Sequence, residues 1–247
     1  MVTYNEQISA AEDLSVTQIF RLGWGIFSRH PILIVIASLL ITVPPYFKDL
    51  LIDKQNLTLS SIGWFILYFV LYVLVSCALI QLLASIVHGE TVKWSAIMST
   101  VRTKSAAAAM TCSIAAVILL VAFLLVIIPG IIMGVFYLFA LQAVILRDFR
   151  GMAALRYSKS LVEGHWWTVF GMLVLLTIAR IAVEYIWGVL IVFIFPDNLL
   201  LLVPTAILDA AFEGFSQVVL LLLFLRLESI KSRAPAAAAP EPVTPGD

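Results

Sequence analysis

The chain has 247 residues, of which 62% are hydrophobic and only 12% are charged. Globular domains contain about 45–50% apolar and about 25% charged residues, so a soluble chain of this composition would lack polar surface. The composition therefore predicts an integral membrane protein. Lys plus Arg and Asp plus Glu number 15 each, a balance that gives no sign of nucleic-acid binding. The two cysteines are too few for a disulfide scaffold or a four-thiolate zinc site.

Six long apolar runs follow a polar N-terminal tail at residues 1–13. The tail has no basic stretch leading into an apolar core, so we expect no cleaved signal peptide. A helix needs about 20 residues to cross a hydrocarbon layer of about 30 Å. We therefore predict one transmembrane domain at residues 14–231, with spans at Pro31–Phe47, Ile62–Val87, Ala106–Ile128, Ile131–Leu146, Trp166–Phe195 and Leu199–Leu225.

The third and fourth runs meet at Pro129 and Gly130. A single helix over residues 106–146 would be about 60 Å long at 1.5 Å per residue, which is twice the membrane thickness. The chain must therefore reverse here. Pro followed by Gly suits the two central positions of a type II turn, in which the glycine has a positive φ.

A short amphipathic segment precedes every second run, at Ser15–Arg29, Thr91–Val101 and Gly151–Val162. Apolar residues recur in these segments at helical spacing. We therefore predict an all-α polytopic membrane protein with six transmembrane helices in three hairpins, each preceded by a short amphipathic cytoplasmic helix. Two explanations stay open for this pattern: a true internal repeat, or separate selection of basic amphipathic helices at the membrane surface.

The distribution of Lys and Arg predicts the orientation. Twelve of them fall in the segments that the hairpins place on one side, whereas only Lys48 and Lys54 fall in the loops of the other side. By the positive-inside rule, both termini face the cytoplasm. We expect a multi-pass protein of the cell inner (plasma) membrane. The Ala- and Pro-rich stretch at residues 232–247 predicts a disordered tail.

One stretch, roughly Val121 to Leu173, resembles a known bacterial family. Its features are Pro129-Gly130, an apolar helix, and then a segment with Gly151, Ser158 and Gly164 followed by Trp166. This pattern is similar to the membrane-domain family of glycerophosphoryl diester phosphodiesterases and to YciC-type inner-membrane proteins. The resemblance implies a six-helix bacterial membrane domain. It implies no phosphodiesterase activity, because no catalytic domain accompanies the membrane domain in this sequence.

Four ionisable residues inside the last two runs form the strongest candidate site. Arg180 and Glu184 are four residues apart, as are Asp209 and Glu213, so each pair lies on one helix face. A charge at bilayer depth costs at least about 2.5–3.5 kcal/mol, so these side chains must face protein or water. If the hairpin turns at Pro196–Asp197, Arg180 lies opposite Glu213. Glu184 then lies opposite Asp209, and one of these two carboxyls is expected to hold a proton.

This candidate cluster has two interpretations. It is either a structural clamp that selects helix partners or a proton or substrate site. If Pro204 begins the sixth helix, the register shifts and Glu184 approaches Glu213 instead of Asp209. An acidic partner from the sixth helix is expected for Arg180, with Glu213 favoured and Glu184 as the alternative.

No catalytic or cofactor motif accompanies this cluster. The sequence has no phosphate-binding glycine loop, no His-Glu-x-x-His and no Gly-x-Ser-x-Gly. His30, His88 and His165 fall at predicted membrane edges, where histidines are typically solvated anchors, so we predict no metal site. Tyr46 and Trp64 at the opposite edge are typical of an aromatic belt. We therefore expect a protein that is not an enzyme and has no cofactor.

Three functions fit these observations. The first is a membrane scaffold or assembly factor, with the lipid bilayer and a membrane protein or a second copy as partners. The second is a small-molecule or proton-linked transporter that uses the charged cluster. The third is an accessory role in lipid metabolism. A transport pathway typically carries polar residues on several helices, whereas here they concentrate on two, so the sequence favours the scaffold.

Overall fold

The structure is a computed structural model that describes residues 16–51, 59–194 and 202–237. Within these ranges the regular elements are all α-helices, which confirms the predicted fold class. The helices are α2 (Val16–Arg29), α3 (Pro31–Leu51), α4 (Leu59–Val87), α5 (Trp94–Leu125), α6 (Ile127–Tyr137), α7 (Ala140–Arg147), α8 (Met152–Val162), α9 (Trp166–Ile194) and α10 (Leu202–Ala237).

Five stretches of the described chain are long and apolar enough to cross a membrane: Ile62–Val87, Trp94–Leu125, Ile127–Arg147, Trp166–Leu190 and Val203–Arg233. A sixth is present if α2 and α3, which meet at a bend of 96°, count as one span. The predicted hairpins correspond to α3–α4, to α5 with α6 and α7, and to α9–α10. The chain is therefore a membrane protein with five spans in its described part, or six if the bent pair counts as one, compared with the six predicted. The predicted first span, Pro31–Phe47, is the one that does not qualify by itself.

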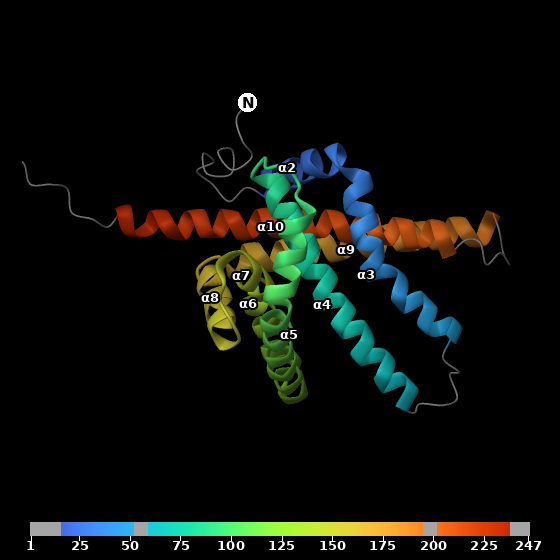
Figure 1. The fold of residues 1–247 in the computed structure, drawn as a ribbon, viewed down its shortest axis with the longest axis horizontal. Coiled ribbons are helices and arrows are strands. Elements are labelled where there is room, and N and C mark those ends of the chain that lie inside the picture. The colour runs from blue at the N-terminus through green and yellow to red at the C-terminus, as the bar shows by residue number, and fades with distance from the viewer. Residues whose placement is uncertain (1–15, 52–58, 195–201, 238–247) are drawn as a thin grey trace, which may run out of the picture.

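The long helix α10 organises the fold (Figure 1). It runs across the molecule, with α9 beside its N-terminal half and with α2 and α3 packed along it. Glycine allows a close approach at two of these contacts. A Cβ added at Gly23 of α2 would lie 3.0 Å from the Val219 side chain, and one added at Gly214 would lie 2.5 Å from the Ile34 side chain of α3. Small residues at a helix interface let the backbones approach closely, which is the usual way membrane helices pack.

Two of the three predicted amphipathic segments are separate helices. The 96° bend separates α2 from α3. Helix α8 is preceded by Gly151 at φ +52° and followed by Gly164 at φ +88°, conformations that glycine adopts at little cost. Its position relative to the membrane surface stays a prediction.

The prediction of a separate amphipathic helix at Thr91–Val101 is wrong. Helix α5 runs without a break from Trp94 to Leu125, 32 residues or about 48 Å. The physical reason is that no glycine or proline lies between the amphipathic part and the apolar part, and the junction is rich in good helix formers. A change from amphipathic to apolar composition does not by itself end a helix.

The predicted type II turn at Pro129 and Gly130 is also wrong. The chain does reverse between α5 and α6, but it does so at Val126, whose backbone is extended with φ −160° and ψ 142°. Pro129 lies in the first turn of α6, where a missing N–H group costs nothing. Gly130 is helical rather than at positive φ. It is required for a different reason, because a Cβ at this position would lie 2.5 Å from the Phe123 ring of α5.

This geometry predicts that Gly130→Ala destabilises the protein. An added methyl group must displace the Phe123 ring, and overpacking of this kind typically costs about 1–3 kcal/mol. Gly134→Ala is the matched control, since a Cβ there lies 3.9 Å from Leu119, an ordinary contact. The measurement is the melting temperature of both variants in detergent. Equal values would contradict the close approach of α5 and α6 at Gly130.

The fourth predicted run, Ile131–Leu146, is broken in the structure. Helix α6 ends at Tyr137 and α7 begins at Ala140. A break inside an apolar span leaves backbone groups without helical partners, and these must be satisfied by other protein groups. Ser158 of α8 does this from a fully buried position. Its Oγ accepts a hydrogen bond from the Phe139 N–H at 3.1 Å and donates one to the Phe136 carbonyl at 2.7 Å.

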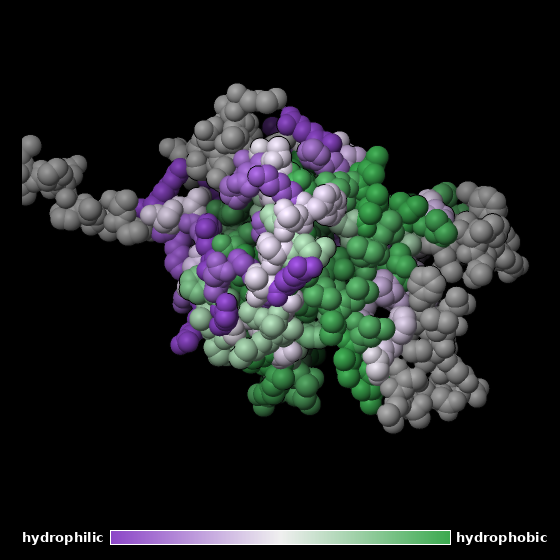
Figure 2. All heavy atoms as spheres, in the orientation of Figure 1, coloured by the Kyte–Doolittle hydropathy of each residue, from purple (hydrophilic) through white to green (hydrophobic). Residues whose placement is uncertain are grey.

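Polar and apolar residues separate on the molecular surface. Figure 2 shows hydrophilic residues over α2, α8 and the far end of α10, and hydrophobic residues over α3, α4 and the tip of the α5–α6 hairpin. This separation is typical of a membrane protein whose hydrophilic side lies at the membrane surface and whose hydrophobic side lies in the bilayer. Helix α10 continues to Ala237, into the segment predicted as a tail. The predicted tail at residues 1–13 and the predicted turn at Pro196–Asp197 lie outside the described residues.

Candidate functional site

The four charged residues predicted inside the last two runs lie near the middle of α9 and on α10. Arg180 is close to the midpoint of α9 and pairs with Glu184 one turn later, with 2.6 Å between the Arg180 Nε and the Glu184 Oε1. The Arg180 Nη1 also lies 3.8 Å from Glu213 Oε2 on α10. The predicted contact between Arg180 and Glu213 is thus present. Arg180 thus has both of the acidic partners that the sequence offered, and Glu184 is the closer one, because an i,i+4 pair needs no helix-to-helix fit.

Two residues that the sequence did not single out for this cluster extend it. The Gln217 Nε2 donates a hydrogen bond to Glu213 Oε1 at 2.9 Å. The Tyr46 hydroxyl of α3 donates a hydrogen bond to Asp209 Oδ2, so Asp209 has a partner other than the predicted Glu184. The sequence indicates only an aromatic-belt role for Tyr46. Its hydrogen bond to Asp209 exists because α3 lies beside α10. The spacing of residues in the sequence does not indicate that these two helices are neighbours.

The charged side chains of the cluster differ in how much of their surface is exposed. Arg180 and Glu184 are each 45% exposed, whereas Glu213 is only 20% exposed. The cluster therefore has a covered part between α3 and α10 and an open part on α9. The open part lies in the middle of a span, where a charge without a protein or water partner is costly.

The second half of α9 is in fact open on most of its surface. No described residue from Thr177 to Leu190 is buried. The partly buried positions are Ala179, Val183 and Trp187, which repeat every four residues and form the face toward α10. At the end of this face the Trp187 indole N–H donates to Thr205 Oγ1 at 3.2 Å. The other faces of this half-helix are not covered by the described chain.

A second polar cluster fastens α7 and α8 to α10. Arg147 forms a two-bond ion pair with Glu228, at 2.5 and 2.6 Å. The Tyr157 hydroxyl donates to the same carboxylate at 2.6 Å. Burial and the neighbouring Glu228 carboxylate raise the pKa of the Tyr157 hydroxyl, so Tyr157 stays a hydrogen-bond donor at ordinary pH. This cluster is fully paired within itself, which fits a structural clamp.

In the described part of the chain, no three His, Cys, Asp or Glu side chains come together in a way that could hold a metal ion. His88 lies at the end of α4, with its Nδ1 2.7 Å from the Ala84 carbonyl oxygen. Cys77 is buried and Cys112 is half-buried, and both are free thiols inside apolar packing.

Residues 52–232 match a family model described as a domain of unknown function, DUF7847. The chain belongs to this family. The DUF7847 match covers α4 to α9 and all but the end of α10, and so it includes Arg180, Glu184, Asp209 and Glu213. Tyr46 lies outside the matched residues. Comparison with curated proteins and with solved structures finds no match.

Proposed function

We propose that this DUF7847 protein is a non-enzymatic membrane assembly factor that binds a transmembrane helix of another membrane protein along the second half of α9. The observation that supports this proposal is the half-exposed Arg180–Glu184 ion pair in the middle of a span. A membrane-embedded charge is stabilised by facing protein or water, and the described chain covers only the α10 side of this half-helix.

The chemistry of this open face suits a partner helix. Thr177, Arg180, Glu184 and Gly188 follow one another at spacings of three and four residues and form one stripe. A Cβ added at Gly188 would meet no atom within 4 Å, so a partner backbone could approach there. Small and polar residues are the ones that hold membrane helices together. The expected partner carries a polar or charged side chain at the depth of Arg180.

Photo-cross-linking tests this proposal. With a benzophenone amino acid at Ile181, beside the ion pair, we expect a single protein adduct of defined mass in native membranes. The matched control is Leu67 of α4, whose side chain has a similar exposure of 61%, compared with 60% for Ile181. The double substitution Arg180→Leu and Glu184→Leu should abolish the Ile181 adduct without lowering the melting temperature.

Three outcomes would contradict the assembly proposal. The first is equal cross-linking at Ile181 and Leu67, which would mean that lipid alone covers α9. The second is an adduct that persists in the doubly substituted protein, since the ion pair would then play no part in recognition. The third is an adduct between two copies of this chain, which would assign the same face to self-association.

A second candidate, a proton- or solute-linked pathway, is favoured by one specific observation. The polar groups lie on three helices rather than two, because Tyr46 of α3 reaches Asp209 while Glu213 reaches toward Arg180 of α9. Proton uptake by proteoliposomes containing the purified protein distinguishes this candidate. Loss of uptake in Glu213→Gln, at an unchanged melting temperature, would favour the pathway over the assembly role.

The orientation is part of the same proposal. We propose that both termini and α8 lie on the cytoplasmic side of the plasma membrane, on the basis of the Lys and Arg distribution. Resemblance to the membrane domains of the phosphodiesterases suggests a bacterial inner-membrane setting. In that setting, one class of partner for the α9 face is a membrane protein that acts on lipids.

A further inference from the structure

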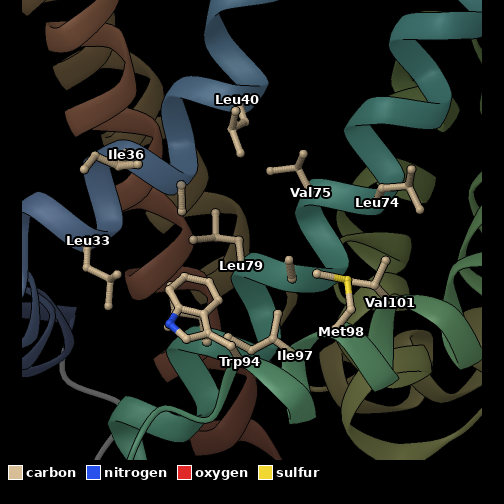
Figure 3. A pocket seen from close by; sticks show the side chains of 13 residues that line it. Leu33, Ile36, Leu40, Leu74, Val75, Leu79, Trp94, Ile97, Met98 and Val101 are labelled. Atoms are coloured by element: carbon tan, nitrogen blue, oxygen red, sulfur yellow. The ribbon is translucent and has the colours of Figure 1, made fainter.

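An apolar groove lies between α3, α4 and the first turns of α5, on a different part of the molecule from the charged cluster. Its volume is about 320 Å³, and every side chain that lines it is apolar. Figure 3 shows Leu33 and Ile36 of α3 on one wall, Leu79 of α4 at the back, and Trp94 and Met98 of α5 near the bottom. The proposed pathway and the proposed partner face use none of these residues.

The groove opens outward rather than into the protein core. On its rim Ile36 is 58% exposed and Met98 is 50% exposed, while Leu79 at the back is buried. Its three walls belong to helices that lie in, or lead into, apolar spans. An apolar hollow at that depth is filled either by a lipid chain or by side chains of another protein.

The wholly apolar lining of the groove suits a lipid chain. An acyl chain is much thinner than a helix and can lie along such a hollow with its methylene groups against the Leu, Ile and Ala side chains.

Charge at one end of the groove indicates which lipid. Lys93 directly precedes Trp94, and Arg29 ends α2 four residues before Leu33, so both basic residues lie near the Leu33–Trp94 end. Glu90 is the one acidic side chain in the short connection from α4 to α5. Basic residues beside a membrane attract anionic lipid headgroups. Trp94 itself suits this place, because its ring is apolar and its N–H can meet the headgroup zone.

We propose that this groove binds one acyl chain of an anionic phospholipid, with the headgroup beside Lys93. The apolar walls hold the chain without regard to the headgroup, and Lys93 selects the negative charge. The proposal is independent of the α9 partner face, because the two sites share no residue.

Native mass spectrometry of the full-length protein tests it. The purified protein is titrated with phosphatidylglycerol and with phosphatidylcholine that carry identical acyl chains. We expect one bound lipid at low concentration, with phosphatidylglycerol preferred about fivefold, the factor expected for one basic residue near a headgroup. Lys93→Gln should lower this preference by about that factor and leave the binding of phosphatidylcholine unchanged.

Filling the groove should abolish binding of both lipids at this site. Ala78 lines the groove, so Ala78→Phe places a ring in it. Ala116→Phe is the matched control, since Ala116 is exposed on another part of α5. Ile36→Trp on the exposed rim serves as the second variant if Ala78→Phe fails to fold. The proposal would be overturned if lipid binding is undiminished in Ile36→Trp, or if Lys93→Gln keeps the full preference for phosphatidylglycerol. It would also be overturned if the protein is a dimer that Ile36→Trp dissociates, because the groove would then hold a second copy of the chain.

Discussion

Gly214→Ala will strongly destabilise the protein, because it adds a methyl group where α10 packs tightly against α3. The new Cβ would lie 2.5 Å from Ile34 Cγ2 and 2.8 Å from Ser38 Oγ. Both of these side chains are fully buried, so neither can move into open space. We expect a loss of about 3 kcal/mol or more, at the upper end of what overpacking typically costs.

The matched controls are Gly171→Ala and Gly188→Ala on α9. A Cβ at either position would meet no atom within 4 Å, and alanine is a better helix former than glycine. Both changes should therefore be neutral or slightly stabilising. Thermal unfolding can be followed with a thiol-reactive dye in a Cys112→Ser background, since Cys77 is buried and reacts only when the fold opens. If Gly214→Ala melts with the two controls, α3 and α10 do not pack as described.

A compensating change gives a second readout for this interface. Ile34→Ala removes the Cγ2 atom that the new methyl group meets, and by itself it should cost about 2–5 kcal/mol. Combined with Gly214→Ala, the loss should be smaller than the sum of the two single losses, because the two changes act on one space. Strict additivity would mean that the two residues do not touch.

The sequence predicted the class of fold and five of the six spans because these depend on local composition. Apolar runs of sufficient length must be helical in a bilayer, where every backbone group needs an internal partner. The separate helices α2 and α8 were also predictable, since Gly151 and Gly164 bound α8. The helix ends that carry no glycine or proline signal of this kind were not predictable. Trp94–Leu125 continues through a change of composition, and the reversal at Val126 carries no turn residue at all.

Part of the candidate site was predictable for the same reason. The pairing of Arg180 with Glu184 follows from spacing along one helix, and the approach of Glu213 follows from depth matching across a hairpin. The contact of Tyr46 with Asp209 joins helices far apart in the sequence. It depends on how α3 crosses α10, which the close approach at Gly214 sets. A single glycine in an apolar run is not enough to predict that two helices cross there.

The break between α6 and α7 depends on one hydroxyl group, so Ser158→Ala should be among the most damaging conservative changes in this chain. The Ser158 Oγ both accepts from the Phe139 N–H and donates to the Phe136 carbonyl. Alanine would leave both backbone groups buried without a partner, and each such group typically costs about 1–3 kcal/mol. Water has little access to relieve this, because Ser158 and Phe139 are fully buried.

Ser160→Ala on the same helix is the control for Ser158→Ala. The Ser160 hydroxyl donates to the Tyr157 carbonyl within α8 and accepts from Lys231 at an exposed position, so its loss should change stability by less than about 1 kcal/mol. Hydrogen exchange gives a readout specific to the break: the Phe139 amide should exchange faster in Ser158→Ala than in the parent protein, while amides in α4 stay protected. If that amide exchanges at the same rate in both proteins, another group satisfies it, and α8 then packs against the break without bridging it.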